Sequence, residues 1–249
     1  MEQKTIQGPH GALAYRQSKG DGHGDVAGVV WLGGFRSDMT GSKATALHDW
    51  AEKNGVGYLR FDYSGHGASA GQFDQGAVSE WLADAKFAIE SLTEGPQILV
   101  GSSMGAWIAT HVALARPALT KAIVFIAPAL DFTSALMWPS FTKQQQDELE
   151  ESGLLRLPSE YGEDLIITKK LIDDGARLSL LDRPIPVSCP VRILQGMRDP
   201  DVPWRHAIRV LDSISGEDVA MSLTKSGDHR LSTDEDIARL ITTVEALQS

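Results

Sequence analysis

The sequence is poor in cysteine, in long apolar runs and in clustered positive charge. Its 249 residues include one cysteine, Cys189, so no internal disulfide can form, and its place at the start of an expected strand indicates a structural role. No apolar run approaches the roughly 20 residues that a membrane-spanning helix needs. The N-terminus shows neither a secretory nor a transit signal. We therefore expect no transmembrane segment and a cytoplasmic location.

Basic residues are fewer than acidic residues. Lysine and arginine number 23 against 33 aspartates and glutamates, which gives a formal net charge of −10. Nucleic acids and anionic membranes are bound by clusters of basic residues, which this sequence lacks. We expect neither as the main partner. With 42% hydrophobic and 22% charged residues, the composition is that of an ordinary globular protein.

What the sequence does have is a regular alternation of short apolar runs and longer amphipathic stretches. This alternation is typical of βαβ units, in which a mostly parallel sheet carries helices on both faces. A last helix is expected to begin at a capping box formed by Ser232 and Glu235. The fold class is therefore α/β with an eight-stranded sheet, whose strands are expected near residues 4–7, 12–17, 28–32, 56–61, 97–101, 121–126, 191–195 and 219–224.

The alternation is interrupted between residues 131 and 188. We expect a single domain, 1–249, in which residues 131–188 form a small cap inserted after the sixth strand. Inside this segment the pattern indicates, in order, a polar helix, a short extended piece and an amphipathic helix, at 144–151, 154–157 and 165–172. Open α/β sheets bind ligands beyond the carboxyl ends of their strands. Met137 and Trp138 are therefore expected to line an apolar substrate pocket; the alternative is that they only fasten the cap to the body.

The pentapeptide Gly101-Ser102-Ser103-Met104-Gly105 follows an apolar strand and precedes a small-residue helix. This strand, turn and helix context is that of a nucleophile elbow, in which glycines on either side of the central serine avoid collisions in a strained turn. Ser103 is the candidate nucleophile, and Ser102 is only its neighbour. The alternative is a tight turn that contains an incidental serine.

Two backbone N–H groups are candidates for stabilising an oxyanion. Met104 opens the helix after the elbow, where N–H groups are unpaired and the helix dipole is positive. Gly33-Gly34-Phe35 follows the third strand, where this architecture places its second donor. We expect the N–H groups of Met104 and Phe35 to form the oxyanion hole, and Gly34 to contact the substrate.

A serine nucleophile needs a base and a group that orients the base. Asp199 follows the strand at 191–195, and His229 follows the last strand, so serine, acid and histidine occur in the expected order. Asp201, two positions on, and Asp131, after the sixth strand, are the alternative acids. His66 lies in a loop near the same edge and is the alternative histidine.

Four segments give the sequence a closer resemblance. They are 60–65 (RFDYSG), 95–107 (GPQILVGSSMGAW), 184–190 (PIPVSCP) and 228–230 (DHR). Through them, along most of its length, the chain resembles the α/β-hydrolases and, within them, the mitochondrial abhydrolase-domain palmitoyl-protein thioesterases that also hydrolyse acyl glucuronides. It departs from them in lacking a mitochondrial presequence and in its acidic composition, which indicates a bacterial-type cytosolic relative.

The resemblance implies a serine hydrolase that acts on S-acyl thioesters and activated acyl esters, with an S-acylated protein or a small ester or thioester as substrate. It implies Ser103 as nucleophile, Asp199 as acid and His229 as base, in agreement with their order in the sequence. No metal or cofactor is expected. The alternatives are a perhydrolase, lactonase or carbon-carbon hydrolase on the same triad, and a catalytically silent binding protein of this fold.

Overall fold

A computed structural model describes residues 2–21, 26–158 and 164–248. Over these residues it contains an eight-stranded sheet with the order β1-β2-β4-β3-β5-β6-β9-β10. β2 is antiparallel to both of its neighbours, and the other pairs are parallel. The expected eight-stranded, mostly parallel sheet is confirmed, with strands β1 Lys4–Gly8, β2 Gly11–Ser18, β3 Gly28–Leu32, β4 Tyr58–Phe61, β5 Gln97–Ser102, β6 Thr120–Ile126, β9 Val191–Gly196 and β10 Val219–Thr224.

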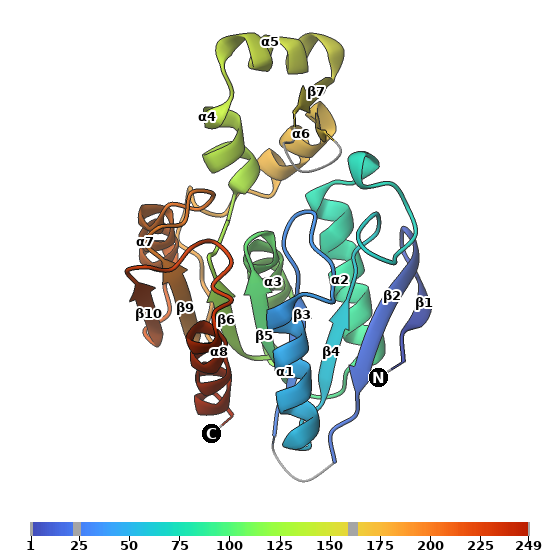
Figure 1. Cartoon of the computed structure of the whole chain (residues 1–249), viewed down its shortest axis with the longest axis vertical. Helices are drawn as coiled ribbons and strands as arrows, with labels where there is room; N and C mark the ends of the chain where they lie inside the picture. The colour runs from blue at the N-terminus through green and yellow to red at the C-terminus, as the bar shows by residue number, and fades with distance from the viewer. Residues whose placement is uncertain (1, 22–25, 159–163, 249) are drawn as a thin grey trace.

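Helices cover both faces of the sheet (Figure 1). Successive side chains of a strand point to opposite faces, and β3 shows this directly: Val29 and Trp31 belong to one apolar core, Val30 and Leu32 to the other. The first core is closed by α1 (Ser42–Lys53) and α8 (Asp234–Ala246). The second is closed by α2 (Val78–Leu92), α3 (Met104–Ala115) and α7 (Trp204–Ser213). Two short 3-10 turns, Phe73–Gln75 and Pro117–Leu119, complete the body.

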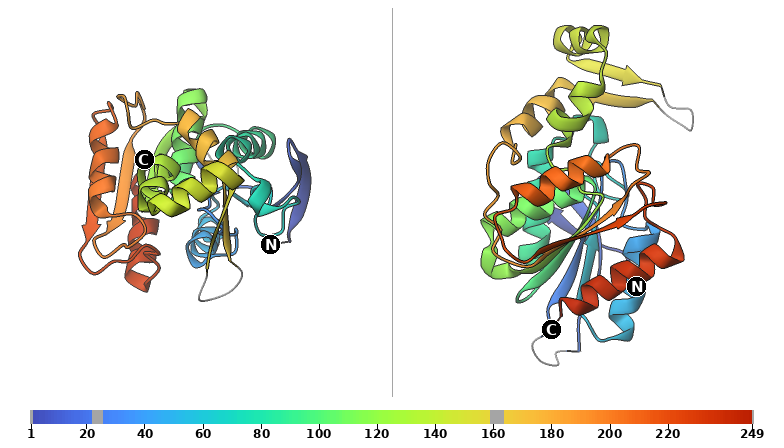
Figure 2. Two further views of the ribbon diagram at one scale, coloured as in Figure 1. Left: turned by 90° about the horizontal axis from the view of Figure 1, so that it is seen from above. Right: turned by 90° about the vertical axis from the view of Figure 1, so that its left-hand side faces the viewer.

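The segment between β6 and β9 stands beyond the carboxyl end of the sheet (Figures 1 and 2). It contains a five-residue π-helix, Thr133–Met137, followed by α4 Trp138–Ser140, α5 Lys143–Ser152, β7 Leu154–Leu157, β8 Leu165–Thr168 and α6 Lys169–Arg177. An insertion after the sixth strand is thus confirmed. α5 and β7 extend away from the body, whereas β8 contacts the 3-10 turn at Phe73–Gln75 and α6 packs against α2.

Two local expectations are corrected. The amphipathic pattern at 165–172 is not one helix, because Leu165–Thr168 pairs antiparallel with β7 and α6 begins only at Lys169, capped by the Thr168 hydroxyl. β-Branched residues fill most of this strand, and they favour extended backbone. The capping box of α8 lies one residue later than expected: Thr233 is the N-cap and Asp236 its partner. Ser232 instead donates to the carbonyl of Arg230.

Backbone strain collects at one edge of the molecule. Among the described residues, five that are not glycine have positive φ, and they are Arg36, Ser103, Ala127, Asp131 and Leu231. All five follow the carboxyl ends of β3, β5, β6 or β10. Positive φ is costly for a residue with a side chain, so the rest of the fold must hold these turns in place.

In the described part of the chain, every helix is too short or too polar to cross a membrane.

Candidate active site

Ser103 lies at the tip of a strained turn between β5 and α3. Its φ of 53° and ψ of −117° lie outside the regions that most residues adopt. The turn is fixed on both sides, since the Ser103 N–H donates to the Ile126 carbonyl at 2.9 Å and the Ser103 carbonyl accepts from the Ala129 N–H at 3.2 Å. The expected strand, turn and helix around this serine are thus present in the structure.

The two glycines of the elbow are required by close backbone contacts. A Cβ at Gly105 would lie 2.0 Å from the Leu32 carbonyl oxygen, because the start of α3 packs directly on the end of β3. A Cβ at Gly101 would lie 2.5 Å from the Gly105 carbonyl oxygen. A larger residue at Gly105 would separate the elbow from β3, and one at Gly101 would push β5 away from the start of α3.

The loop after β3 lies against Ser103. A Cβ at Gly34 would be 3.3 Å from the Ser103 Cβ and 4.0 Å from its Oγ. The Gly34 N–H donates to Ser37 Oγ at 3.0 Å, and the Ser37 N–H donates back to the Gly34 carbonyl at 3.1 Å, so a small closed turn presents the next residue. That residue is Phe35, whose ring packs on Phe73 and Trp81 with centroids 4.8 and 5.9 Å away.

The two expected oxyanion donors have no competing partner among the described residues. Met104 is the first residue of α3, so its N–H has no acceptor within the helix. No described acceptor is bonded to the Phe35 N–H either. Gly34 differs, because its N–H is already used by Ser37.

Asp199 and His229 form a hydrogen-bonded pair. His229 Nδ1 lies 2.8 Å from Asp199 Oδ2, and the Asp199 side chain is fully buried whereas the His229 side chain is 25% exposed. Burial alone would raise the pKa of Asp199, but hydrogen bonds from His229 and from the N–H groups of Val202 and Asp201 outweigh it and lower that pKa. An ionised carboxylate only accepts, so Nδ1 carries the proton and Nε2 is left free to take one.

Two glycines bring the acid and histidine loops together. A Cβ at Gly196 would lie 2.4 Å from the Gly227 carbonyl oxygen, and a Cβ at Gly227 would lie 3.1 Å from the Gly196 Cα. The Arg198 N–H also donates to the Gly227 carbonyl at 2.9 Å. The loops after β9 and β10 are therefore one packed unit, which is how residues 30 positions apart become partners.

The histidine loop is held by its own Asp228 and by Lys43, a residue that the sequence did not single out. Lys43 on α1 reaches across to donate to the Arg230 carbonyl and, at 3.3 Å, to Ser232 Oγ. Burial lowers the pKa of the Lys43 ammonium. Asp228 Oδ1 accepts the N–H groups of Arg230 and Leu231, both at 3.0 Å. A lysine on a distant helix carries no motif, so only the fold could reveal this contact.

Within the described residues, no hydrogen bond joins Ser103 Oγ to His229, although both lie at the same sheet edge. Such bonds are often long before substrate binds. The structure thus brings together Asp199 with His229, and Ser103 with Gly34, as two halves of one candidate site.

Among the described residues, neither alternative acid is hydrogen-bonded to a histidine. Asp131 is buried and accepts hydrogen bonds from Ser179, Leu180 and Leu181, none of them a histidine. Asp201 does not cap α7, whose N-cap is Pro203 without a side-chain bond. The carboxylate of Asp201 does lie within 4.8 Å of Asp199 and His229 ligand atoms.

Those three residues are the one described cluster with the composition of a metal site. The Asp199 oxygens already accept from Gln195, His229, Asp201 and Val202. A cation here would displace the hydrogen bond between Asp199 and His229. The geometry is therefore that of an oriented histidine, and the absence of a metal or cofactor stays a prediction.

His66 belongs to the aromatic packing behind the oxyanion loop. Its ring lies 5.0 Å from both Phe73 and Trp81, Nδ1 contacts the Ser64 carbonyl at 3.2 Å, and Nε2 is buried without a described partner. Burial lowers the pKa of His66 to about 4. It is a neutral packing residue at neutral pH.

This depressed pKa predicts a contribution to acid sensitivity. Between about pH 6.5 and pH 4 the unfolded chain binds a proton at His66 that the folded chain does not, so stability falls as pH falls. His66→Phe should remove about 2 kcal/mol of the loss between pH 7 and pH 5. Urea unfolding at the two pH values measures this, with exposed His10→Gln as control. An unchanged difference between the two pH values in His66→Phe would contradict it.

Met137 and Trp138 lie in the insertion, at the junction of the π-helix and α4. Both are half-buried and pack on the second core, and the Trp138 ring lies 6.3 Å from that of Phe141. Among the described residues, no hydrogen bond or ring contact joins either residue to Ser103, so their role in substrate binding stays a prediction.

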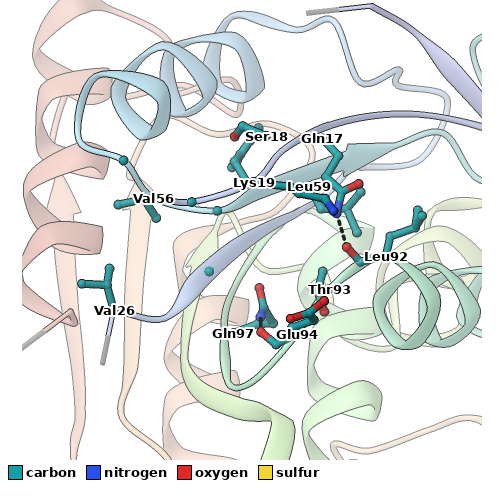
Figure 3. A pocket seen from close by; sticks show the side chains of 15 residues that line it. Gln17, Ser18, Lys19, Val26, Val56, Leu59, Leu92, Thr93, Glu94 and Gln97 are labelled. Atoms are coloured by element: carbon teal, nitrogen blue, oxygen red, sulfur yellow. Dashed lines mark hydrogen bonds between the residues drawn. The ribbon is translucent and has the colours of Figure 1, made fainter. Parts of the chain in front are cut away.

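A cavity of about 360 Å³ lies away from these residues (Figure 3). It is bordered by Gly28 and Gln97, the first residues of β3 and β5, and by Gln17, which donates to the Leu92 carbonyl. Ser103 follows the opposite end of β5. This cavity is therefore no part of the candidate active site.

The fold and the elbow define a class, the α/β-hydrolases, and the comparisons with known proteins agree. The model of the family Hydrolase_4, described as "Serine aminopeptidase, S33", matches residues 27–171. The chain belongs to this family of α/β-hydrolases and is a hydrolase. The expected α/β-hydrolase fold is confirmed.

Individual relatives are also similar over their length. Palmitoyl-protein thioesterase ABHD10, mitochondrial, of Bos taurus is 40% identical over 239 residues, covering 94% of this chain and 76% of the relative. A solved structure from Agrobacterium vitis has a TM-score of 0.94 and 40% identity, covering 100% of this chain and 99% of that one. Mouse α/β hydrolase domain-containing protein 10 has a TM-score of 0.89 and 36% identity, covering 99% and 98% of the two chains.

These relatives correct one expectation. The Bos taurus relative named above and its rat and human counterparts are all named as mitochondrial proteins. The cytoplasmic location expected from the N-terminus is contradicted by this finding and is wrong.

Proposed function

We propose that the chain is a serine hydrolase that cleaves carboxylic ester or thioester bonds through Ser103, His229 and Asp199. The observation that carries the proposal is the 2.8 Å contact between His229 Nδ1 and buried Asp199, at the same sheet edge as a serine on a strained turn. That contact leaves His229 Nε2 as a base, and a serine hydroxyl needs such a base at neutral pH.

In the proposed mechanism the substrate carbonyl lies between Ser103 and the loop of Gly34 and Phe35. His229 takes the Ser103 proton as the hydroxyl attacks, and the N–H groups of Met104 and Phe35 stabilise the oxyanion. His229 then protonates the leaving alcohol or thiol, which leaves an acyl-enzyme. Water, activated by His229, attacks the acyl-enzyme and releases the acid. No step uses a metal or cofactor.

The relatives favour thioesters as substrates. Since the curated relatives are named palmitoyl-protein thioesterases, we propose S-acyl thioesters, including S-acylated proteins, as the substrate class. Residues 131–188 would then act as a cap over the acyl chain, with Met137 and Trp138 on its inner side. The apolar packing of both residues at the base of the insertion supports this role.

A fluorophosphonate probe tests the proposal. We expect it to label the wild type and Ser102→Ala but not Ser103→Ala, since only Ser103 stands at the elbow tip. Hydrolysis of p-nitrophenyl esters and S-acyl thioesters should fall by at least about a thousandfold in Ser103→Ala. A folded wild type that is neither labelled nor active, or label that persists in Ser103→Ala, would refute the proposal.

A further inference from the structure

Both ends of the insertion are tied to one buried carboxylate. Asp131, 2% exposed, stands where the chain leaves the body after β6. Its Oδ2 accepts from Ser179 Oγ at 2.7 Å and from the Leu181 N–H at 2.8 Å, and its Oδ1 accepts from the Leu180 N–H at 2.9 Å. The chain leaves α6 and returns to the body through Ser179, Leu180 and Leu181. One side chain therefore joins the exit and the return of the insertion.

Neutral donors surround this carboxylate. No ion pair of the described residues includes Asp131. Its backbone has a φ of 55°, and its own carbonyl accepts from the N–H of Ala135, a residue of the π-helix, at 2.8 Å. A strained backbone of this kind persists only where surrounding contacts hold it, and these hydrogen bonds supply such contacts.

The segment that carries Asp131 also touches the candidate active site. Two residues before it, the Ala129 N–H donates to the Ser103 carbonyl at 3.2 Å. One residue after it, the Phe132 ring lies 5.3 Å from that of Phe35 on the oxyanion loop. The residues on either side of Asp131 therefore lie between the insertion and the candidate active site.

The root of the insertion is packed too closely to adjust easily. A Cβ at Gly175 of α6 would lie 2.1 Å from Thr133 Oγ1, so α6 rests directly on the π-helix. On the far side, the Leu178 carbonyl accepts from Trp107 at 3.2 Å and contacts His111 at 3.0 Å, both residues of α3. The first and last segments of the insertion are thus fixed to each other and to α3, the helix that begins at the elbow.

We propose that Asp131 is a specificity-determining positioning residue: by holding residues 179–181 against the exit from β6, it sets where the insertion stands over Ser103 and so which acyl-chain lengths fit. The inference rests on the proposed serine-hydrolase function. Asp131 touches neither substrate nor reacting atoms in this proposal. It acts through the position of the insertion.

The test compares Asp131→Asn with Asp182→Asn. Asparagine keeps the size of the side chain but turns one acceptor into a donor that faces N–H groups. Asp182 is exposed, accepts from the same Ser179 hydroxyl at 3.1 Å and lies 3.8 Å from Arg209, but it bonds to neither Leu180 nor Leu181 among the described residues, so its variant is the matched control. Initial rates with p-nitrophenyl acetate and p-nitrophenyl dodecanoate give kcat/KM for a short and a long acyl chain.

In Asp131→Asn we expect the ratio of dodecanoate to acetate kcat/KM to fall by about tenfold, with kcat for acetate within about threefold of wild type. Asp182→Asn should keep the wild-type ratio. An unchanged ratio in folded Asp131→Asn, an equal loss for both esters, or the same fall in Asp182→Asn would each overturn the inference.

Two further readouts cover other outcomes. If Asp131→Asn does not fold, Ser179→Ala removes one bond to the carboxylate without a change of charge, and it should lower the ratio by about twofold to threefold. Hydrogen exchange at the Leu180 and Leu181 N–H groups measures how firmly Asp131 holds them and needs no substrate. It should accelerate in Asp131→Asn. If the wild type hydrolyses no ester but exchange accelerates in Asp131→Asn, the proposed function is refuted and the positioning of residues 179–181 by Asp131 is not. Unchanged exchange in Asp131→Asn would refute that positioning.

Discussion

Replacing Asp199 by asparagine is expected to lower kcat for ester hydrolysis by about ten-thousandfold. The asparagine amide would donate toward His229 Nδ1, so the imidazole would carry its proton on Nε2 and could not accept one from Ser103. The size of the side chain, and the backbone N–H groups of Val202 and Asp201 that bond to it, would change little. Steady-state rates with a p-nitrophenyl ester, together with the rate of fluorophosphonate labelling, measure the effect.

Asp201→Asn is the matched control, because Asp201 is the neighbouring carboxylate and lies within 4.8 Å of the same ligand atoms. Its kcat should stay within about threefold of wild type, since it makes no described hydrogen bond to His229. A large loss in Asp201→Asn with a small one in Asp199→Asn would reverse the assignment of the acid.

Replacing Gly105 by alanine is expected to destabilise the protein by about 3 kcal/mol and to abolish most activity. Alanine is favoured over glycine in a helix by roughly 1 kcal/mol, so helix propensity alone predicts a gain. The new Cβ would, however, lie 2.0 Å from the Leu32 carbonyl oxygen and 2.7 Å from that of Gly33. Both are backbone atoms, which cannot rotate away, so the end of β3 and the oxyanion loop must move.

Thermal unfolding checks this prediction, with Gly57→Ala as control. Gly57 is half-buried and directly precedes β4, but the atom nearest to a new Cβ there is 3.5 Å away, an ordinary contact. We expect Gly57→Ala within about 0.5 kcal/mol of wild type, and Gly105→Ala to unfold roughly 6 to 12 °C lower. Equal melting temperatures for the two variants would show that β3 and α3 are not packed as described.

The sheet was predictable from the sequence because its signals are local. Most of its parallel strands are short apolar runs between glycine, proline or polar turns, and a buried parallel strand needs little else. The same holds for Ser103, whose elbow is fixed by glycines two positions away on each side. The boundary inside 165–172 was less visible, because helix and strand patterns overlap in so short an apolar stretch and the pairing with β7 decided it.

The support of the candidate site was not predictable, since it depends on contacts between distant segments. Lys43 lies 187 positions before Arg230, and nothing in the sequence around it indicates that it anchors the histidine loop. Asp131 could be named from its place after a strand, but its partners at 179–181 follow an insertion of about 50 residues, whose path only the fold gives. The Gly196 and Gly227 contact is of the same kind.

The five strained residues have a consequence for how the protein can be improved. Each positive-φ position other than glycine costs on the order of 1 kcal/mol or more, and all five follow strands at the sheet edge that carries the candidate active site. Relaxing these turns would gain stability where catalysis needs the geometry. The opposite end of the sheet has an open cavity bordered by Gly28 and Gln97, and no proposed catalytic residue lies there. Engineers seeking a more heat-resistant form should fill that end and leave the strained edge alone.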